Sequence, residues 1–196
     1  IELIAAGAIA VQGNITNSSG EVIISGNTDA DGDDEDVTIS ANLDAGGDVV
    51  VTVQGASGDI IIDADQDNRG ATTLNGPVSL NEDLVAADDI TVNGGIVIDG
   101  DNDGVDLTRS ITSNTSIDIN GDITAIAGVG GTPTTEHLTL TASEEIVVES
   151  VGTDAAPVGD LNIVADNVGL GGDINALSLV TTLSGMITLH TTVNID

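Results

Sequence analysis

The chain has 196 residues, and its 33 acidic residues face only two arginines and no lysine, which gives a formal net charge of −31. This charge argues against nucleic acid and anionic membrane surfaces as partners, because phosphate binding depends on Lys and Arg, and it favours cations. Cys, Phe, Trp and Tyr are all absent, so any core must be built from Val, Ile and Leu without disulfides. No apolar run approaches the length of a membrane span, so we expect no membrane insertion.

Short aliphatic stretches separated by turn residues recur along the chain. Several alternate apolar and polar residues with period two, which is typical of strands with one buried face. No segment shows a helical period, and β-branched residues dominate. The strands predicted in this way are, in chain order, Glu21–Ser25, Asp36–Ser40, Asp48–Val53, Asp59–Asp63, Asp89–Val92, Gly95–Asp99, Ser116–Ile119, His137–Thr141, Glu145–Ser150, Asp160–Val164 and Met186–His190.

Five segments begin in the same way, with Gly, then Asp, then an aliphatic residue. Imperfect self-similarity of this kind indicates a repeat architecture. Asn-Gly pairs at Asn75, Asn93 and Asn120 add turn signals. The Gly-Asp-aliphatic starts lie at Gly47-Asp48-Val49, Gly58-Asp59-Ile60, Gly121-Asp122-Ile123, Gly159-Asp160-Leu161 and Gly172-Asp173-Ile174.

The pattern predicts an all-β chain that forms a parallel β-solenoid, or β-helix, with acidic corner loops. We expect one elongated domain over residues 1–196, with about ten rungs of ~20 residues each and a rod of ~45–50 Å at the ~4.8 Å spacing of paired strands. Its acidic half, residues 1–106, holds 22 of the acids, and the less acidic half, residues 107–196, holds 11. Tandem immunoglobulin-like sandwiches are the alternative, since they also have short strands at close spacing, although they usually pack around an aromatic residue.

Two stretches of the acidic half resemble each other: residues 96–104 read IVIDGDNDG and residues 60–68 read IIIDADQDN. In the first, Asp99, Asp101 and Asp103 with Gly104 match the opening half of a calcium-loop pattern. Calcium takes six to eight oxygen ligands and accepts irregular geometry. Position twelve of an EF-hand count is Ser110 rather than Glu, so the stretch predicts a calcium loop but not an EF-hand.

The remaining candidate calcium ligands extend this prediction to three acidic loops. Asp and Asn also favour turns for backbone reasons alone, so solvated turns are the competing interpretation. The further candidates are Asp106 beside the first loop, Asp63, Asp65 and Asp67 in the second, and Asp29, Asp31, Asp33 and Asp36 in the third.

Catalytic residues are scarce in the sequence. The two histidines, His137 and His190, have no nucleophile placed beside them by any pattern. Paired carboxylates are plentiful, as glycosidases need, but a sugar-binding groove would be expected to offer aromatic, Arg or Lys side chains. We therefore expect no enzymatic activity, and we keep a polysaccharide-active β-helix enzyme as an alternative.

The rhythm of residues 46–95, GGDVVVTVQGASGDIIIDADQDNRGATTLNGPVSLNEDLVAADDITVNGG, with a second run at residues 121–125, resembles the repetitive β-strand shafts of giant bacterial surface proteins. It is similar to filamentous-haemagglutinin-like adhesin shafts. The resemblance covers most of the chain but lies in composition and rhythm, and the missing Lys and heavy Asp content depart from it. It implies a right-handed parallel β-helix, export to the cell surface, and a role as shaft, fibre or adhesin.

These observations together predict a non-enzymatic structural protein of an extracellular surface fibre or adhesin shaft. Open end rungs are unpaired sheet edges, which invite another copy or a neighbouring segment of a longer chain to stack. Calcium in the acidic loops would neutralise charge and stabilise the rod. The alternative is a calcium-rigidified sandwich domain in an adhesin stalk.

Overall fold

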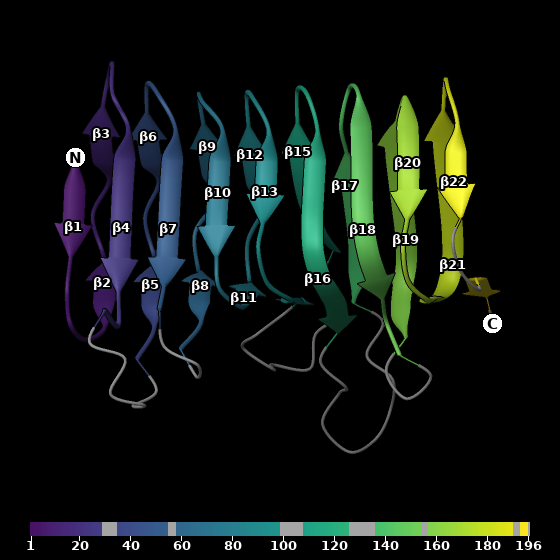
Figure 1. The fold of residues 1–196 in the computed structure, drawn as a ribbon, viewed down its shortest axis with the longest axis horizontal. Coiled ribbons are helices and arrows are strands. Elements are labelled where there is room, and N and C mark those ends of the chain that lie inside the picture. Colours follow the sequence, from purple (N-terminus) through teal and green to yellow (C-terminus); the bar gives the residue numbers. More distant parts are fainter. Residues whose placement is uncertain are drawn as a thin grey trace.

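A computed structural model describes residues 1–28, 35–54, 58–98, 108–125, 136–153, 157–189 and 193–195. The described residues form 23 β-strands and no helix. Within these ranges no helix has the length and hydropathy needed to span a membrane. The strands stand side by side along the long axis of the molecule, with the two termini at opposite ends (Figure 1).

Three strand directions repeat along the chain, and each gives one face of the coil, named here faces A, B and C. Face A contains β1 (Glu2–Ile4), β4 (Val22–Gly26), β7 (Val49–Val53), β10 (Thr72–Asn75), β13 (Ile90–Val92), the first part of β16 (Ile117–Ala125), the first part of β18 (Glu145–Val151), β20 (Asn167–Leu170) and β22 (Ile187–Leu189).

Face B contains β2 (Ile9–Val11), β5 (Val37–Ile39), β8 (Ile60–Ile62), β11 (Val78–Leu80), β14 (Ile96–Ile98), the second parts of β16 and β18, the start of β21 (Ile174–Leu183) and β23 (Val193–Ile195). Face C contains β3 (Ile15–Asn17), β6 (Leu43–Ala45), β9 (Gln66–Asn68), β12 (Leu84–Ala86), β15 (Thr108–Ser113), β17 (His137–Thr141), β19 (Val158–Ala165) and the rest of β21.

The predicted parallel β-solenoid is confirmed. Every pairing between described strands is parallel and joins a strand to the equivalent strand of the next rung. The alternative of tandem immunoglobulin-like sandwiches is wrong, because those domains are built from antiparallel strands. All eleven predicted strands overlap observed ones.

The rungs are not equal in length. The sequence offset between paired strands runs from 18 residues, for Thr72 and Ile90, to 29 residues, for Ile117 and Ile146. The long connections join face A to face B, as between β4 and β5, or face B to face C, as between β14 and β15. Nine strands stack on the described part of face A, against the predicted number of about ten rungs. The observed number is smaller because the longer corners use residues that a further rung would need.

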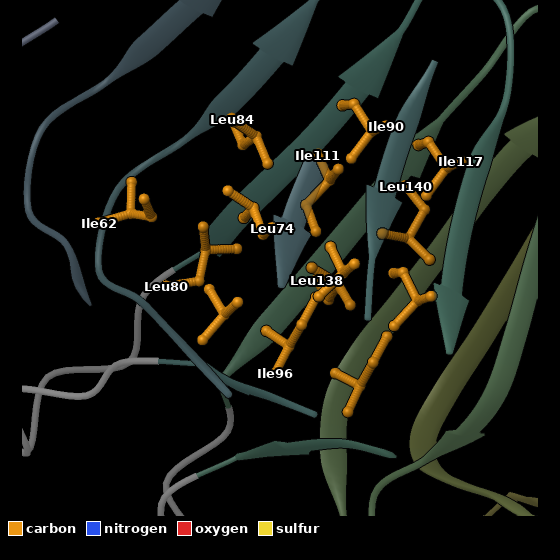
Figure 2. Close-up of a cluster of buried hydrophobic side chains, with 14 of the residues drawn as sticks. Ile62, Leu74, Leu80, Leu84, Ile90, Ile96, Ile111, Ile117, Leu138 and Leu140 are labelled. Carbon is orange, nitrogen blue, oxygen red and sulfur yellow. The ribbon is translucent and has the colours of Figure 1, made fainter. Parts of the chain in front are cut away.

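The core consists of aliphatic columns that run along the rod. Alternate residues of each strand point inward, as the period-two pattern requires. One column on face A, the inner column, contains Leu3, Ile24, Val51, Leu74, Val92, Ile119, Val148, Leu170 and Leu189 in successive rungs. Figure 2 shows neighbouring columns, in which Leu84, Ile111 and Leu140 follow one another on face C. The narrow, even interior explains how the protein forms a core without aromatic residues.

Face C carries one interruption, which we call the seam. Strand β6 pairs with β3 and β9 pairs with β12, but no backbone ladder joins β6 to β9. Gln66, a buried residue of β9, bridges the gap with its side-chain amide. Its Oε1 accepts the N–H of Leu43 at 3.1 Å, and its Nε2 donates to the carbonyls of Ala41 at 3.2 Å and Ala64 at 2.7 Å. The side chain thus replaces ladder hydrogen bonds that the backbone does not make there.

Candidate functional site

The predicted calcium ligands divide into those the structure describes and those it does not. Asp99, Asp101, Asp103, Asp106, Asp29, Asp31 and Asp33 lie outside the described residues. Asp36, Asp63, Asp65 and Asp67 are described, and Asp63, Asp65 and Asp67 are exposed.

The similarity between residues 60–68 and 96–104 has a structural counterpart. Strands β8 and β14, which supply the two aliphatic halves, both lie on face B, and β11 pairs with each of them. The two aliphatic halves therefore lie on the same face, two rungs apart. Asp36 lies at the other edge of face B, just before β5. Asp36 therefore precedes a strand of face B, whereas Asp63 follows one.

Three of the four described carboxylates of these loops accept hydrogen bonds from the next rung. Asp36 Oδ1 accepts the backbone N–H of Asp59 at 2.9 Å. Asp63 Oδ1 accepts from the side-chain amide of Asn81 at 2.7 Å, and Asp65 Oδ1 accepts the N–H of Asp83 at 3.4 Å. These carboxylates link one rung to the following rung.

The same arrangement recurs at other corners. Asp48 Oδ1 accepts the N–H of Ala71 at 3.1 Å, and Asp83 Oδ1 accepts the N–H of Ser110 at 2.8 Å. Asp89 accepts the N–H of Ser116 at 3.2 Å. In each case the acceptor precedes the donor by one rung, and the carboxylate accepts a backbone N–H at or near the start of a strand of the next rung. Many corner aspartates thus have a structural role that needs no metal.

No group of three or more His, Asp or Glu side chains in the described part of the chain is arranged so that it could hold a metal ion. Calcium binding therefore stays a prediction that rests on the sequence pattern of the acidic loops.

The Asn-Gly turns form a second set of polar contacts between rungs, in addition to those of the carboxylates. Asn93 Nδ2 donates to Asn75 Oδ1 at 2.8 Å, and Asn120 Nδ2 donates to Asn93 Oδ1 at 3.2 Å. The following glycines also stack directly, because a Cβ on Gly94 would overlap the carbonyl oxygen of Gly76. The predicted turn residues therefore also connect rungs, an arrangement that only the register of the coil reveals.

The two arginines have different environments. Arg69 pairs with Asp44 across the seam, with Nη2 to Oδ1 at 2.7 Å, and the two side chains are 51% and 38% exposed. Such a pair contributes little to stability. Arg109 points inward from β15 in the column that continues through Leu138. Sequence reasoning did not anticipate a buried base at that position.

A hollow of about 440 Å³ lies on the outer side of face C around His137, Asp160 and Ser178. His137 Nδ1 accepts the N–H of Asp160 at 2.8 Å and lies 3.3 Å from its Oδ2. Ser178 is in register with Asp160 on the next strand. Activation of a serine requires a base within hydrogen-bond reach of its hydroxyl, and among the described residues no hydrogen bond joins Ser178 to His137. The other histidine, His190, lies outside the described residues.

The two ends of the rod are open. Among the described strands, β1, β2 and β3 each pair on one side only, as do β22 and β23. The second half of β21 pairs with β19 and with no later strand. Each end thus presents three strand edges, one from each face.

No family model matches this chain, and comparisons with curated proteins and with solved structures find no match.

Proposed function

We propose that this chain is a non-enzymatic structural protein that serves as a stiff shaft segment of an extracellular surface fibre or adhesin. The observation that carries the proposal is the inner column of face A, which continues through nine rungs from Leu3 to Leu189. Such a coil makes backbone hydrogen bonds along its axis, so bending it would stretch ladders on every face. The likeness of residues 46–95 to filamentous-haemagglutinin-like shafts supports the same role.

The acidic surface supports an extracellular location. A net charge of −31 opposes compaction unless cations screen it, and calcium, the ion proposed for the acidic loops, is available to extracellular modules at the millimolar level. The partners that fit are cations and other solenoid rungs, either in another copy or in neighbouring segments of a longer chain. Nucleic acid does not fit this charge.

The shaft proposal is tested by measuring stiffness in the monomer. The chain has no Cys, so Glu2→Cys and Thr188→Cys introduce unique labelling sites in one outward column of face A. The eight rung spacings between β1 and β22 predict a separation of ~38 Å at ~4.8 Å per spacing. Pulsed electron paramagnetic resonance on dilute, spin-labelled protein should give one narrow distance distribution. A broad distribution would contradict a stiff shaft.

The location is tested on cells that produce the protein. Immunogold electron microscopy with antibodies against the 196-residue chain should label filaments outside intact cells. Label confined to the cell interior would overturn the extracellular assignment.

Calcium stabilisation is a separate part of the proposal. A ligand that binds only the folded state stabilises it, by about 2.7 kcal/mol at a hundredfold excess over Kd. Calorimetry should show that millimolar calcium raises Tm and that chelator lowers it, with magnesium as the control ion. Asp101→Ala and Asp63→Ala should each reduce the calcium-dependent rise. An unchanged Tm in calcium would remove calcium from the proposal while leaving the shaft role intact.

A further inference from the structure

Strand β18 carries an exposed valine between two glutamates. Its residues alternate between buried and exposed, and Glu145, Val147 and Glu149 are the exposed ones on the outer side of face A. Val147 is 37% exposed, whereas the other large exposed aliphatic side chains of the described residues lie near the two ends of the rod. An exposed valine is common by itself, so its surroundings decide what it can bind.

The neighbouring strands complete the surroundings of Val147. Asp118 of β16 is in register with Val147 on one side, and Gly169 of β20 is in register with it on the other (Figure 1). Val147 is therefore flanked by acidic residues on three sides, two of them along its own strand, and its fourth side is open. We call these five residues, Asp118, Glu145, Val147, Glu149 and Gly169, the Val147 site.

Gly169 leaves the fourth side open without any steric need. A Cβ at this position would meet only the two Cγ atoms of Val147, at 3.7 and 4.0 Å, which is ordinary van der Waals contact. Its φ also lies outside the left-handed region that favours glycine. Glycine inside a strand weakens it and often marks a place where a ligand or another backbone approaches closely.

A hollow of about 270 Å³ borders Val147 on the side of Asp118. Its lining includes Asp89, Asp118, Glu145 and Val147. The side chains of Lys and Arg combine an apolar stem with a cationic head. One such side chain can lay its stem against Val147 and place its head among the carboxylates.

We propose that the Val147 site docks an extended basic segment of another protein, in which two cationic residues flank an aliphatic residue. Glu145 and Glu149 are four residues apart, or about 13 Å along a strand, and an extended partner repeats that spacing. Its aliphatic residue covers Val147, and its two cations face Glu145 and Glu149. This inference goes beyond the proposed shaft function and does not depend on it.

Charge decides the kind of partner. The chain has no Lys and only two arginines, of which Arg69 pairs with Asp44 and Arg109 is buried. A second copy, or another stretch of the same composition, would bring mainly further carboxylates to the Val147 site, and facing like charges oppose association. A basic segment is instead attracted by the field of the acidic rod before contact and by the three acidic residues on contact.

The test titrates the 196-residue chain with the capped peptide Gly-Lys-Thr-Val-Thr-Lys-Gly and follows the amide and methyl NMR signals of the protein. The largest shifts are expected at Asp118, Val147 and Gly169, and the affinity should fall as salt is added. A peptide of the same composition with adjacent lysines, Gly-Lys-Lys-Thr-Val-Thr-Gly, should bind about threefold more weakly, because it loses one exposed ion pair.

Variants separate the charged contacts from the apolar one. Glu145→Gln and Glu149→Gln should each weaken the first peptide about threefold. Glu21→Gln is the matched control, since Glu21 holds the position before β4 that Glu145 holds on β18, and it should leave the affinity unchanged. Gly169→Leu covers Val147 without changing any charge and should weaken binding about tenfold. Circular dichroism verifies folding, and Val147→Thr replaces Gly169→Leu if the latter loses its β signal.

Three results would overturn the proposal. Shifts spread evenly over the acidic rungs, or equal affinities for the two peptides, would show only a general attraction of cations to the rod. Equally large shifts at the Val147 site with spermidine would show that a small polycation suffices. Unchanged affinity in Gly169→Leu, or in its substitute, would remove the apolar contact on which the docking depends. All three results would leave the shaft proposal standing, because its test is the spin-label distance.

Discussion

Leu74 in the middle of the rod and Leu189 in its last rung occupy the same inner column, yet Leu74 is 2% exposed and Leu189 is 48% exposed. The two residues have the same side chain, point the same way and lie in strands of the same face. They differ only in whether a rung covers them on both sides. An aliphatic residue of this protein becomes core only through its neighbours along the axis, so a middle rung and an end rung of similar sequence have different energetics.

The largest expected effect comes from the stacked glycine corner of the middle rungs. Gly94→Ala places a methyl group where the backbone of Gly76 lies, and both rungs must shift to relieve the overlap. We expect a loss of about 4 kcal/mol in the free energy of unfolding, measured by denaturant titration, because overpacking against backbone has no flexible group to yield. Gly13→Ala in the first rung is the control, since no atom lies within 4 Å of the added Cβ. Equal losses at both sites would contradict the stacked corner.

The inner column itself gives the next prediction. Leu74→Ala leaves a cavity between covered rungs and should cost about 3 kcal/mol. Leu189→Ala removes a side chain that is already half in water and should cost less than about 1 kcal/mol. Both are measured by chemical denaturation of dilute, monomeric protein. Comparable losses would show that the last rung is covered in solution.

The seam is a weak point within the middle rungs, and Gln66 is its test. Gln66→Leu keeps the volume but leaves the N–H of Leu43 and the carbonyl of Ala41 without the amide that now binds them. We expect a loss of about 2 kcal/mol, because each buried polar group left unpaired costs about 1–3 kcal/mol. Gln12→Leu, at an exposed site of the first rung, should change stability by less than about 0.5 kcal/mol. Amide hydrogen exchange should also quicken at Leu43 in Gln66→Leu, and unchanged exchange there would count against the bridge.

The smallest effect is expected at the carboxylate caps. Asp83→Ala removes the acceptor of the Ser110 N–H and should lower the free energy of unfolding by about 1 kcal/mol. Asp83→Asn keeps an oxygen acceptor and should retain most of the stability. If Asp83→Asn is as damaging as Asp83→Ala, the negative charge rather than the hydrogen bond would be what stabilises this corner.

About half of the strands could be predicted from the sequence, and the misses have a physical pattern. Consecutive aliphatic residues identified β7 and β8 directly. Strand β9 reads Gln66-Asp67-Asn68 and has no aliphatic residue at all. It is a strand because β12 pairs with it and because Gln66 finds backbone partners across the seam. Strands of this kind form through their neighbours, which a local pattern does not contain.

The candidate site shows the same division. The acidic stretches were identifiable as a recurring feature, and the sequence correctly related the aliphatic starts of residues 60–68 and 96–104, since β8 and β14 share face B. The partner of each carboxylate was not predictable. Asp65 accepts from a residue 18 positions later and Asp83 from one 27 positions later, because corner connections differ in length from rung to rung.

The sequence by itself determined that the protein is all-β, that its core is aliphatic and narrow, and that its surface is strongly acidic, because side-chain chemistry and period-two alternation are local properties. The tertiary structure decided which strands share a face, which aspartates cap the next rung, and where the ladder is interrupted. It also decided which residues of neighbouring rungs form the continuous inner column of face A. These features depend on the register between rungs 18 to 29 residues apart, and only the folded coil fixes that register.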